Sequence, residues 1–509
     1  MRFMDMMKIK MRVYAWMALI GFFAFFGNAV GQGRALSFDE ALQMVLINNE
    51  VMKQASHHNR QMEEELKSVR MLRLPQVALN ANYIMLSDDI TIDMHEIKDA
   101  ITPLYGALSQ YGVFSGIPNP DPATAGVMPY LPAEISTPLV REQLAAGLQK
   151  VENGNWDKLI QKGQFGTLSA GVQWPLFTGG KINAANRAAQ IRVDEASLVE
   201  RQKSAALHTQ LVERYFGLAL AWQAELVREE VFQVMEAHLH DAQKMFDEGM
   251  IARAELLHAR VFHAQADREL KMARRERQIV NEALINTLAL NDAESLVPIT
   301  SLFAVQQIEP INFFKLQALA SNPSLGQVEA KQSLARQGVR AEKSAFMPTV
   351  AAFGNYNIAN IDLSPNVSDY MVGVTLSWKL FGGSSTRHKV NAARYVEAQV
   401  DEVRAKAMRD IDTGIEKYYQ EMNMALEQLE QLEIAGEFAD EYQRIRQQAF
   451  NEGMATSTEV VDASLAVAKV KIDRLQAMYR LNVSLARLLE LAGIPEYFSD
   501  YQTVASIGR

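Results

Sequence analysis

Histidines and a carboxylate around one glycine are the side chains whose spacing could support chemistry. His240 lies nine residues before Gly249 and His258 lies nine residues after it, so a turn at Gly249 would bring the two imidazoles face to face. With Glu255 beside them, they would form a transition-metal or pH-sensing site. The histidines lack tight ligand spacing, so ordinary surface histidines are the favoured interpretation. We predict no metal site and no cofactor.

The rest of the sequence offers few residues or motifs that are typical of enzymes. The chain has no cysteine, which excludes disulfide scaffolds, thiolate metal sites and cysteine nucleophiles. It has no G-x-S-x-G and no H-E-x-x-H motif. Gly179-Gly180-Lys181 lacks the upstream glycine and the following Ser or Thr of a phosphate loop, so it indicates a turn. A secreted hydrolase is the alternative that these absences count against, and we predict that the chain is not an enzyme.

Composition limits the class of protein further. The chain has 509 residues, is 48% hydrophobic and carries a formal net charge of −9. It is long enough for two or three domains and too hydrophobic to be disordered. An acidic balance argues against a nucleic-acid partner, because phosphate binding needs concentrated Lys and Arg.

The first residues read as an export signal. Lys8, Lys10 and Arg12 precede an apolar run from Val13 to Phe26, and small residues follow at 29–31. We predict a signal peptide over 1–31 that is removed on export. No later segment reaches 18 consecutive apolar residues. If the chain enters a bilayer, it must therefore do so as strands.

The chain is an internal duplication. Asn49 to Tyr83 matches Asn322 to Tyr356 at an offset of 273 residues, and downstream matches have an offset of 204. The downstream matches pair Trp174 with Trp378, Gly179 with Gly383, and Phe246-x-Glu248-Gly249-Met250 with Phe450-x-Glu452-Gly453-Met454. The change of offset indicates an insertion in the first half, between Tyr83 and Gly166.

We predict the same order of elements in both halves. Long stretches without proline allow unbroken helices of roughly 100 Å. Apolar residues repeat at threes and fours along the second long helix, as in a coiled coil, for example Val400, Val403, Ala407 and Ile411. The first repeat, 32–310, has a helix over 37–74, strands at about 76–87 and 165–176, a long helix over 181–248 and a return helix over 252–291. The second, 311–493, has a helix over 312–346, strands at about 349–358 and 370–380, a long helix over 384–451 and a return helix over 457–492. The insertion covers about 88–163, and 494–509 is a C-terminal tail.

The four expected strands alternate with period two. In the second, Leu168, Ala170, Val172 and Trp174 share one face and polar or small residues share the other. Runs of about ten residues suit a tilted transmembrane strand, and an aromatic residue near one end of each suits a membrane interface. Those aromatic residues are Tyr83, Trp174, Tyr356 and Trp378. A small soluble sheet with one wet face is the alternative. Four strands cannot close a membrane barrel, so several protomers would have to share one.

These features resemble the TolC family of outer-membrane efflux and secretion channels. The resemblance covers Leu36 to about Gly493 and is most specific at Phe246-x-x-Gly249 and Phe450-x-x-Gly453. It implies a mainly α protein with a membrane β-barrel: a homotrimer that shares a 12-stranded barrel in outer-membrane lipid and continues as a coiled-coil-like α-helical barrel across the periplasm. A periplasmic adaptor (membrane fusion protein) and an inner-membrane transporter would be its partners.

The resemblance also implies roles for the hairpin turns. The turns would contact the adaptor through Gly249, Met250, Gly453, Met454 and Ala455, although glycine turns need no partner to explain them. Acids on the return helices would form a ring that selects cations and binds divalent ions, although acids also suit a solvated helix N-terminus. The matching acids are Glu255, Glu459 and Asp462. Phe stands where a Tyr is common before each turn, and Ala455 carries no charge where some members place a basic residue. These residues therefore do not indicate which contacts hold the mouth closed.

The predicted function is therefore a passive exit duct of a tripartite efflux or type I secretion system. A structural periplasmic coiled-coil scaffold without channel activity is the alternative, and solubility would favour it. Topology places the proline-rich insertion outside the cell, as a pore cap, a partner-binding segment or a variable loop. The residues do not identify the substrate, the adaptor or the pump.

Overall fold

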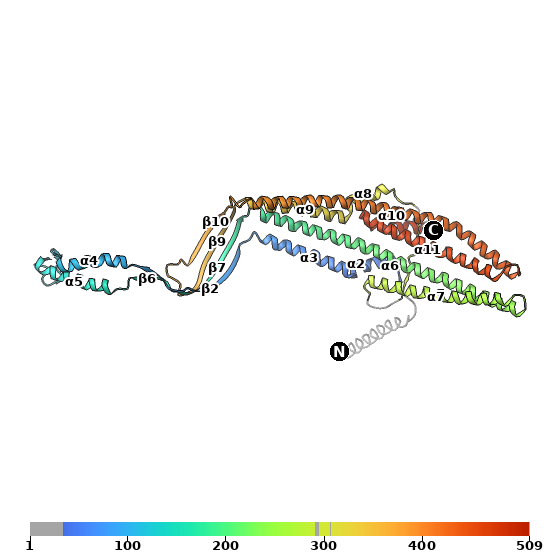
Figure 1. Ribbon diagram of the computed structural model, residues 1–509, viewed down its shortest axis with the longest axis horizontal. Coiled ribbons are helices and arrows are strands. Elements are labelled where there is room, and N and C mark those ends of the chain that lie inside the picture. Colours follow the sequence, from blue (N-terminus) through green and yellow to red (C-terminus); the bar gives the residue numbers. More distant parts are fainter. Residues whose placement is uncertain (1–33, 291–294, 306, 508–509) are drawn as a thin grey trace, which may run out of the picture. The chain divides into compact units, whose positions relative to one another are not determined.

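The computed structural model describes residues 34–290, 295–305 and 307–507, which form a helical unit and a sheet unit (Figure 1). The helical unit comprises the described residues up to Arg70, Asn183–Lys343 and the chain from Ser384 onwards. The sheet unit comprises Met71–Ile182 and Ser344–Gly383. The predicted signal peptide, 1–31, lies outside the described residues.

The helical unit shows the duplication in its element lengths. The long helices α6 (Lys181–Asp247) and α10 (Ser385–Asn451) both have 67 residues, or about 100 Å at 1.5 Å per residue. The return helices α7 (Arg253–Leu288) and α11 (Ser457–Ala492) both have 36 residues. Shorter elements complete this unit: β1 (Arg34–Leu36), α2 (Phe38–Asn48), α3 (Glu50–Met71), β8 (Leu296–Pro298), α8 (Ile311–Ser321), α9 (Pro323–Lys343) and α12 (Tyr497–Ile507). Among the described residues, no helix has both the length and the apolar character needed to cross a bilayer.

An aromatic cluster forms the main core of the helical unit. Phe38 from α2 packs against Tyr215 and Phe216 of α6 and against Phe498 of α12, with ring centroids 5.3 to 5.6 Å apart. The buried Tyr215 hydroxyl donates to the Leu36 carbonyl at 2.6 Å and accepts from the Thr300 N–H at 3.0 Å. The parallel pair of β1 and β8 is thereby tied to the long helix.

Two asparagines divide the helices that were predicted as continuous over 37–74 and 312–346. Asn49 separates α2 from α3, and Asn322 separates α8 from α9. The Asn49 side chain accepts from the Val51 N–H at 2.9 Å and donates to the Thr287 carbonyl at 2.9 Å. Asn322 accepts from the Ser324 N–H at 2.8 Å and donates to the Leu491 carbonyl at 2.7 Å.

The prediction of unbroken helices was therefore wrong. Each asparagine caps the start of a new helix and also satisfies a carbonyl in the last turn of a return helix. The Asn322-Pro323 pair carried the missed signal, because Asn is a preferred helix N-cap and Pro is a preferred first helical residue.

The sheet unit contains one four-stranded antiparallel sheet (Figure 1). Its order is β10 (Tyr370–Ser377), β9 (Thr349–Ile361), β7 (Gln164–Phe177) and β2 (Gln76–Met85). The insertion lies between β2 and β7 and contains β3 (Ile90–Asp93), α4 (His95–Tyr111), β4 (Ile117–Pro118), β5 (Tyr130–Leu131), α5 (Ala133–Asn153) and β6 (Asp157–Gln161).

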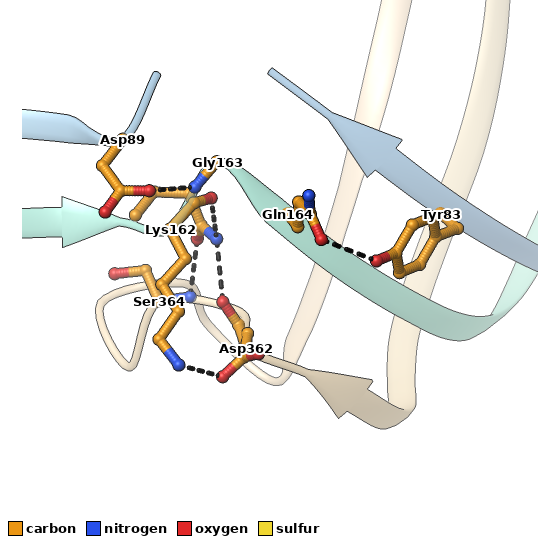
Figure 2. Close-up of polar contacts among 8 residues, drawn as sticks. Tyr83, Asp89, Lys162, Gly163, Gln164, Asp362 and Ser364 are labelled. Carbon is orange, nitrogen blue, oxygen red and sulfur yellow. Dashed lines mark hydrogen bonds and ion pairs between the residues drawn. The ribbon is translucent and has the colours of Figure 1, made fainter. Parts of the chain in front are cut away.

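The base of the insertion is bonded to the loop between β9 and β10 (Figure 2). The Gln161 side chain accepts from the Ser364 N–H at 2.7 Å and donates to the Asp362 carbonyl at 2.8 Å. Lys162 pairs with the Asp362 carboxylate at 2.5 Å, and the Gly163 N–H donates to Asp89 at 2.6 Å. The insertion is thus anchored where it leaves the sheet.

The Asn322 contact yields a first testable prediction. Asn322→Ala removes a helix cap and leaves the Leu491 carbonyl without this donor, so we expect a loss of stability of about 1–3 kcal/mol. Asn322→Ser is the matched control: it keeps a cap acceptor but lacks the amide donor, and its thermal midpoint should lie between those of Ala and the parent. Equal midpoints for all three proteins would contradict this account.

His208 yields a second prediction. Its ring lies in the core, 5.8 Å from Phe38 and 5.7 Å from Phe498, and neither ring nitrogen has a hydrogen-bond partner. Burial lowers the pKa of His208 from 6.5 to about 4. Between pH 6.5 and about pH 4, the unfolded protein therefore binds a proton at His208 that the folded protein does not. The contribution of neutral His208 to the folding stability is complete above pH 6.5 and falls as the pH approaches 4.

His208→Leu should remove this part of the pH dependence. We expect the difference in unfolding free energy between parent and variant to change by roughly 3 kcal/mol across that range. The measurement is thermal or denaturant unfolding of the detergent-purified protein at several pH values. A constant difference between the two proteins would contradict the assignment.

Candidate functional site

The strand register places most of the large apolar residues of the four strands on one face of the sheet. Val77 of β2 lies opposite Val172 of β7, which lies opposite Gly354 of β9, which lies opposite Val372 of β10. Large side chains on this face are exposed: Val77 at 71%, Val372 at 74%, and also Leu79, Val374 and Leu376. A contiguous exposed apolar face of this kind is typical of a surface that contacts lipid or a partner.

The opposite face is mainly polar. Asn80 lies opposite Ser169, which lies opposite Asn357, and Gly171 lies opposite Asn355. The neighbouring positions Gln173 and Thr375 extend this polar surface, while Phe353 and Met371 interrupt it. One apolar face and one polar face are what a strand between lipid and a water-filled lumen requires.

The predicted interface aromatics are exposed, but equivalent residues of the two repeats are not level in the sheet. Tyr83 is level with Ile361, five residues beyond Tyr356 along β9. Trp174 is level with Ala352 and hence with Val374, four residues before Trp378. The second repeat is thus displaced along the strands. Such a stagger accompanies strands that tilt in a closed barrel.

Both tryptophans also anchor strand ends. The Trp174 indole donates to the Arg73 carbonyl at 3.0 Å, and the Trp378 indole donates to the Phe346 carbonyl at 3.1 Å. These acceptors are equivalent in the two repeats, at the offset of 273 residues. The tryptophans therefore have a structural role in addition to the predicted one at the interface.

The two hairpin turns have the same backbone geometry. Gly249 and Gly453 have φ angles of +76° and +73°, which favour glycine. The Gly249 N–H donates a hydrogen bond of 2.9 Å to the Phe246 carbonyl, and the Gly453 N–H donates an equal one to Phe450. In each turn the N–H of the following methionine then donates to a carbonyl five residues earlier, at 2.8 Å, and this bond closes the helix. Met250 and Met454 follow and are 63% and 72% exposed, while Ala455 is half-buried. Each turn thus presents one flexible apolar side chain to solvent.

The return helices begin differently. Thr456 caps α11 in a capping box, in which its hydroxyl accepts from the Glu459 N–H while the Glu459 carboxylate accepts from the Thr456 N–H. Ala252 occupies the equivalent position before α7 and has no capping side chain. The first turn of α11 is therefore better stabilised than that of α7.

The three predicted gate acids have different environments. Glu459 serves the cap and also lies 3.4 Å from Arg446. The Thr456 N–H bond holds the pKa of the Glu459 carboxyl below its usual value, so this acid stays ionised near neutral pH. Asp462, one turn later on α11, is exposed. Glu255 on α7 is half-buried, and its Oε2 atom is buried without a hydrogen-bond partner.

In the part of the chain that the structure describes, His240, His258 and Glu255 do not bring their ligand atoms within 4.8 Å of one another. His240 is exposed, and the His258 Nδ1 atom faces the Thr458 hydroxyl at 3.4 Å. Within the described ranges, one group of metal-capable side chains has its ligand atoms within 4.8 Å of one another: Asp93, His95 and Asp157, all exposed. A local turn explains part of it, because the Asp93 carboxylate accepts from the His95 N–H, two residues on, at 2.8 Å.

Sequence reasoning missed His238, which joins the first hairpin to the second. Its Nε2 atom lies 2.6 Å from the Ser457 hydroxyl, and its ring centroid lies 4.9 Å from that of Phe450. It is 3% exposed. Spacing along the chain could not reveal this contact, because the two residues are 219 positions apart.

Comparison with known proteins identifies the family. The outer membrane efflux protein family model matches residues 143–290 and 316–494, which is more than half of the chain. Protein CyaE of Bordetella pertussis is 27% identical over 237 residues, covering 44% of this chain and 48% of that protein. The alkaline protease secretion protein AprF of Pseudomonas aeruginosa is 22% identical over 317 residues, covering 60% and 65%. These matches span about half to just under two thirds of each relative's length.

Solved structures agree on the fold. The Campylobacter jejuni CmeC outer membrane channel has a TM-score of 0.65 at 13% identity, with 91% of this chain and 89% of that chain covered. The Vibrio cholerae outer membrane protein VceC has a TM-score of 0.64 at 13% identity, covering 90% and 96%. The predicted fold class, that of the TolC-like channels, is confirmed. The chain belongs to the outer membrane efflux protein family, and its location is the outer membrane.

Proposed function

We propose that this chain is the passive exit duct of a tripartite efflux or type I secretion system, working as a homotrimer. The observation that carries the proposal is the sheet: it has an exposed apolar face, a mainly polar opposite face and two outer edges, on β2 and β10, that pair with no other described strand. In a bilayer those edges must pair, and pairing β10 of one copy with β2 of the next supplies the missing bonds. Three copies give a 12-stranded barrel with a lumen wide enough for water.

The long hairpins support the rest of the pathway. Helices of about 100 Å are long enough to carry a tunnel into the periplasm, so that cargo bypasses that compartment. Their exposed methionine turns suit docking to an adaptor, which would connect the duct to an inner-membrane transporter that supplies the energy. Gly249, Met250, Gly453, Met454 and Ala455 are the proposed contacts.

The acids support a selective mouth. Threefold symmetry would triple Glu459, Asp462 and Glu255 and concentrate negative charge, which attracts cations and binds divalent ions. Asp462 is the acid best placed to act, because it is exposed whereas Glu459 is engaged by its cap and by Arg446.

The barrel predicts a specific effect of proline in β10. The Asn357 N–H donates to the Asp369 carbonyl, so Asn357 and Asp369 are a hydrogen-bonded pair of the ladder. Such pairs alternate along β10 with pairs whose N–H groups point away from β9, and Val374 belongs to the second kind. Val374→Pro removes an outward donor and keeps the ladder to β9. We expect the detergent-stable oligomer to dissociate, as measured by size-exclusion chromatography with light scattering.

Val374→Thr is the matched control and should remain trimeric, because it keeps the backbone donor. Thr375→Pro should instead disrupt the β9 pairing and the sheet itself. An unchanged oligomer in Val374→Pro would contradict assembly through this edge. Recovery of the parent as a soluble periplasmic protein would favour the scaffold instead.

The acid ring predicts a change in conductance. We expect cation-selective single channels that divalent ions block in a planar bilayer, with both properties reduced in Glu459→Gln/Asp462→Asn. Gln at 459 can still make the capping bond, so the variant tests charge rather than helix structure. Glu452→Gln, at an exposed acid just before the Gly453 turn, is the control and should behave as the parent. Unchanged selectivity in the double variant would exclude a selective ring formed by Glu459 and Asp462, and absence of channels would contradict the duct.

A further inference from the structure

One buried histidine joins the two hairpins of a protomer at their tips. His238 on α6 reaches Ser457, the first residue of α11, with Nε2 and Oγ 2.6 Å apart. Both residues are buried, at 3% and 1% exposure, and the imidazole also packs on Phe450 of α10. This is a short polar bond between two buried side chains, so its strength depends on the protonation state of the imidazole.

The surrounding contacts make His238 the main polar connection at this point. His258 of α7 lies beside it and faces Thr458, the next hydroxyl of α11, at the longer distance of 3.4 Å. Further along the helices, Val231 and Met235 of α6 pack against Val461 and Ala468 of α11. The two hairpins are therefore held together by an apolar seam, by ion pairs between α6 and α11 such as Glu230–Lys471 at 2.8 Å, and, toward the tips, by two imidazole–hydroxyl contacts.

We propose that His238 is the latch between the two hairpin tips, and that its protonation releases the start of α11 from the first hairpin. The inference rests on the proposed function for its consequence, because release at the tips would loosen the mouth of the duct. The latch itself is a contact within one chain and can be tested separately.

The physical argument begins with the second ring nitrogen. His238 Nδ1 is buried and has no hydrogen-bond partner, so an added proton there would be an unpaired buried donor. Ser457 lies at the N-terminus of α11, where the helix dipole is positive and disfavours a cation. An imidazolium is therefore more stable in water, with the tips apart, than in the joined state.

The charges around the ring act in both directions. Asp241 on α6 and Glu255 on α7 favour the cation, and His258 on α7 opposes it. Arg446 of α10 and Glu459 of α11 lie on the other hairpin and pair with each other at 3.4 Å. Burial outweighs the two carboxylates and lowers the pKa of His238 below 6.5. The latch is thus complete above pH 6.5 and is lost as the pH falls through that lowered value.

The absence of native cysteine allows a direct test in the full-length oligomer. Cysteines introduced as Met250→Cys and Met454→Cys, both exposed, carry spin labels, and pulsed EPR measures their separation in labelled protomers diluted with unlabelled ones. Between about pH 8 and about pH 5, we expect the distance distribution of the parent to shift to longer, broader values. With His238→Gln, which hydrogen-bonds without titrating, the shift should be lost.

Two further variants complete the test. His240→Gln is the matched control at an exposed histidine two residues away and should keep the full shift. Ser457→Ala removes the hydroxyl and should give the broadened distribution already at about pH 8. A parent without a pH-dependent shift, or a shift that persists in His238→Gln, would overturn the proposal. A normal latch in a protein that conducts no ions would instead contradict the proposed duct and leave the latch intact.

Discussion

A strand in a bilayer must pair its backbone groups on both sides, because hydrocarbon offers no replacement for water. The four-stranded sheet of this chain satisfies that requirement for β9 and β7, whereas β10 and β2 each have one side that pairs with no strand in the described ranges. Other features are arranged around this constraint. Most large apolar residues of the strands share one face, the second repeat is staggered along the strands, and a tryptophan of each repeat anchors a strand end by its indole. A chain with these properties is incomplete alone.

The helical unit contains two copies of one motif. The two copies share their asparagine contacts and hairpin turns, and they differ at the ends of their return helices. Asn49 and Asn322 bind the carbonyls of Thr287 and Leu491, which are equivalent residues of the two repeats. The two tips have the same turn bonds. The repeats differ where the return helices begin and end: Thr456 caps α11 where Ala252 stands before α7, and Gly493 ends α11 where Ala289 adopts a left-handed φ of 53°. The second hairpin thus has the better-capped return helix, and His238 connects the first hairpin to its start.

Local rules account for much of what could be predicted. Proline-free stretches indicate where long helices run, glycine indicates where they turn, and alternation indicates strands, because each depends on residues close together in the chain. The helix breaks at Asn49 and Asn322 were missed although Asn is a preferred cap residue, because an asparagine within a helical stretch does not by itself end the helix. The acid positions were identifiable by resemblance, but their environments were not. Glu459 engages Thr456 and Arg446, Asp462 is exposed, and Glu255 has a buried unpaired oxygen.

The sequence by itself determined the duplication, the fold class, the family resemblance and the absence of thiol chemistry, since these depend on residue types and their order. Tertiary structure alone decided which strands are neighbours, how far the repeats are staggered, and that His238 rather than His240 lies at the junction of the hairpins. The reason is distance along the chain. The bond between His238 and Ser457 joins residues 219 positions apart, and the bond between Asn49 and Thr287 joins residues 238 apart. Such pairings follow from the packing of whole helices, which no local periodicity specifies.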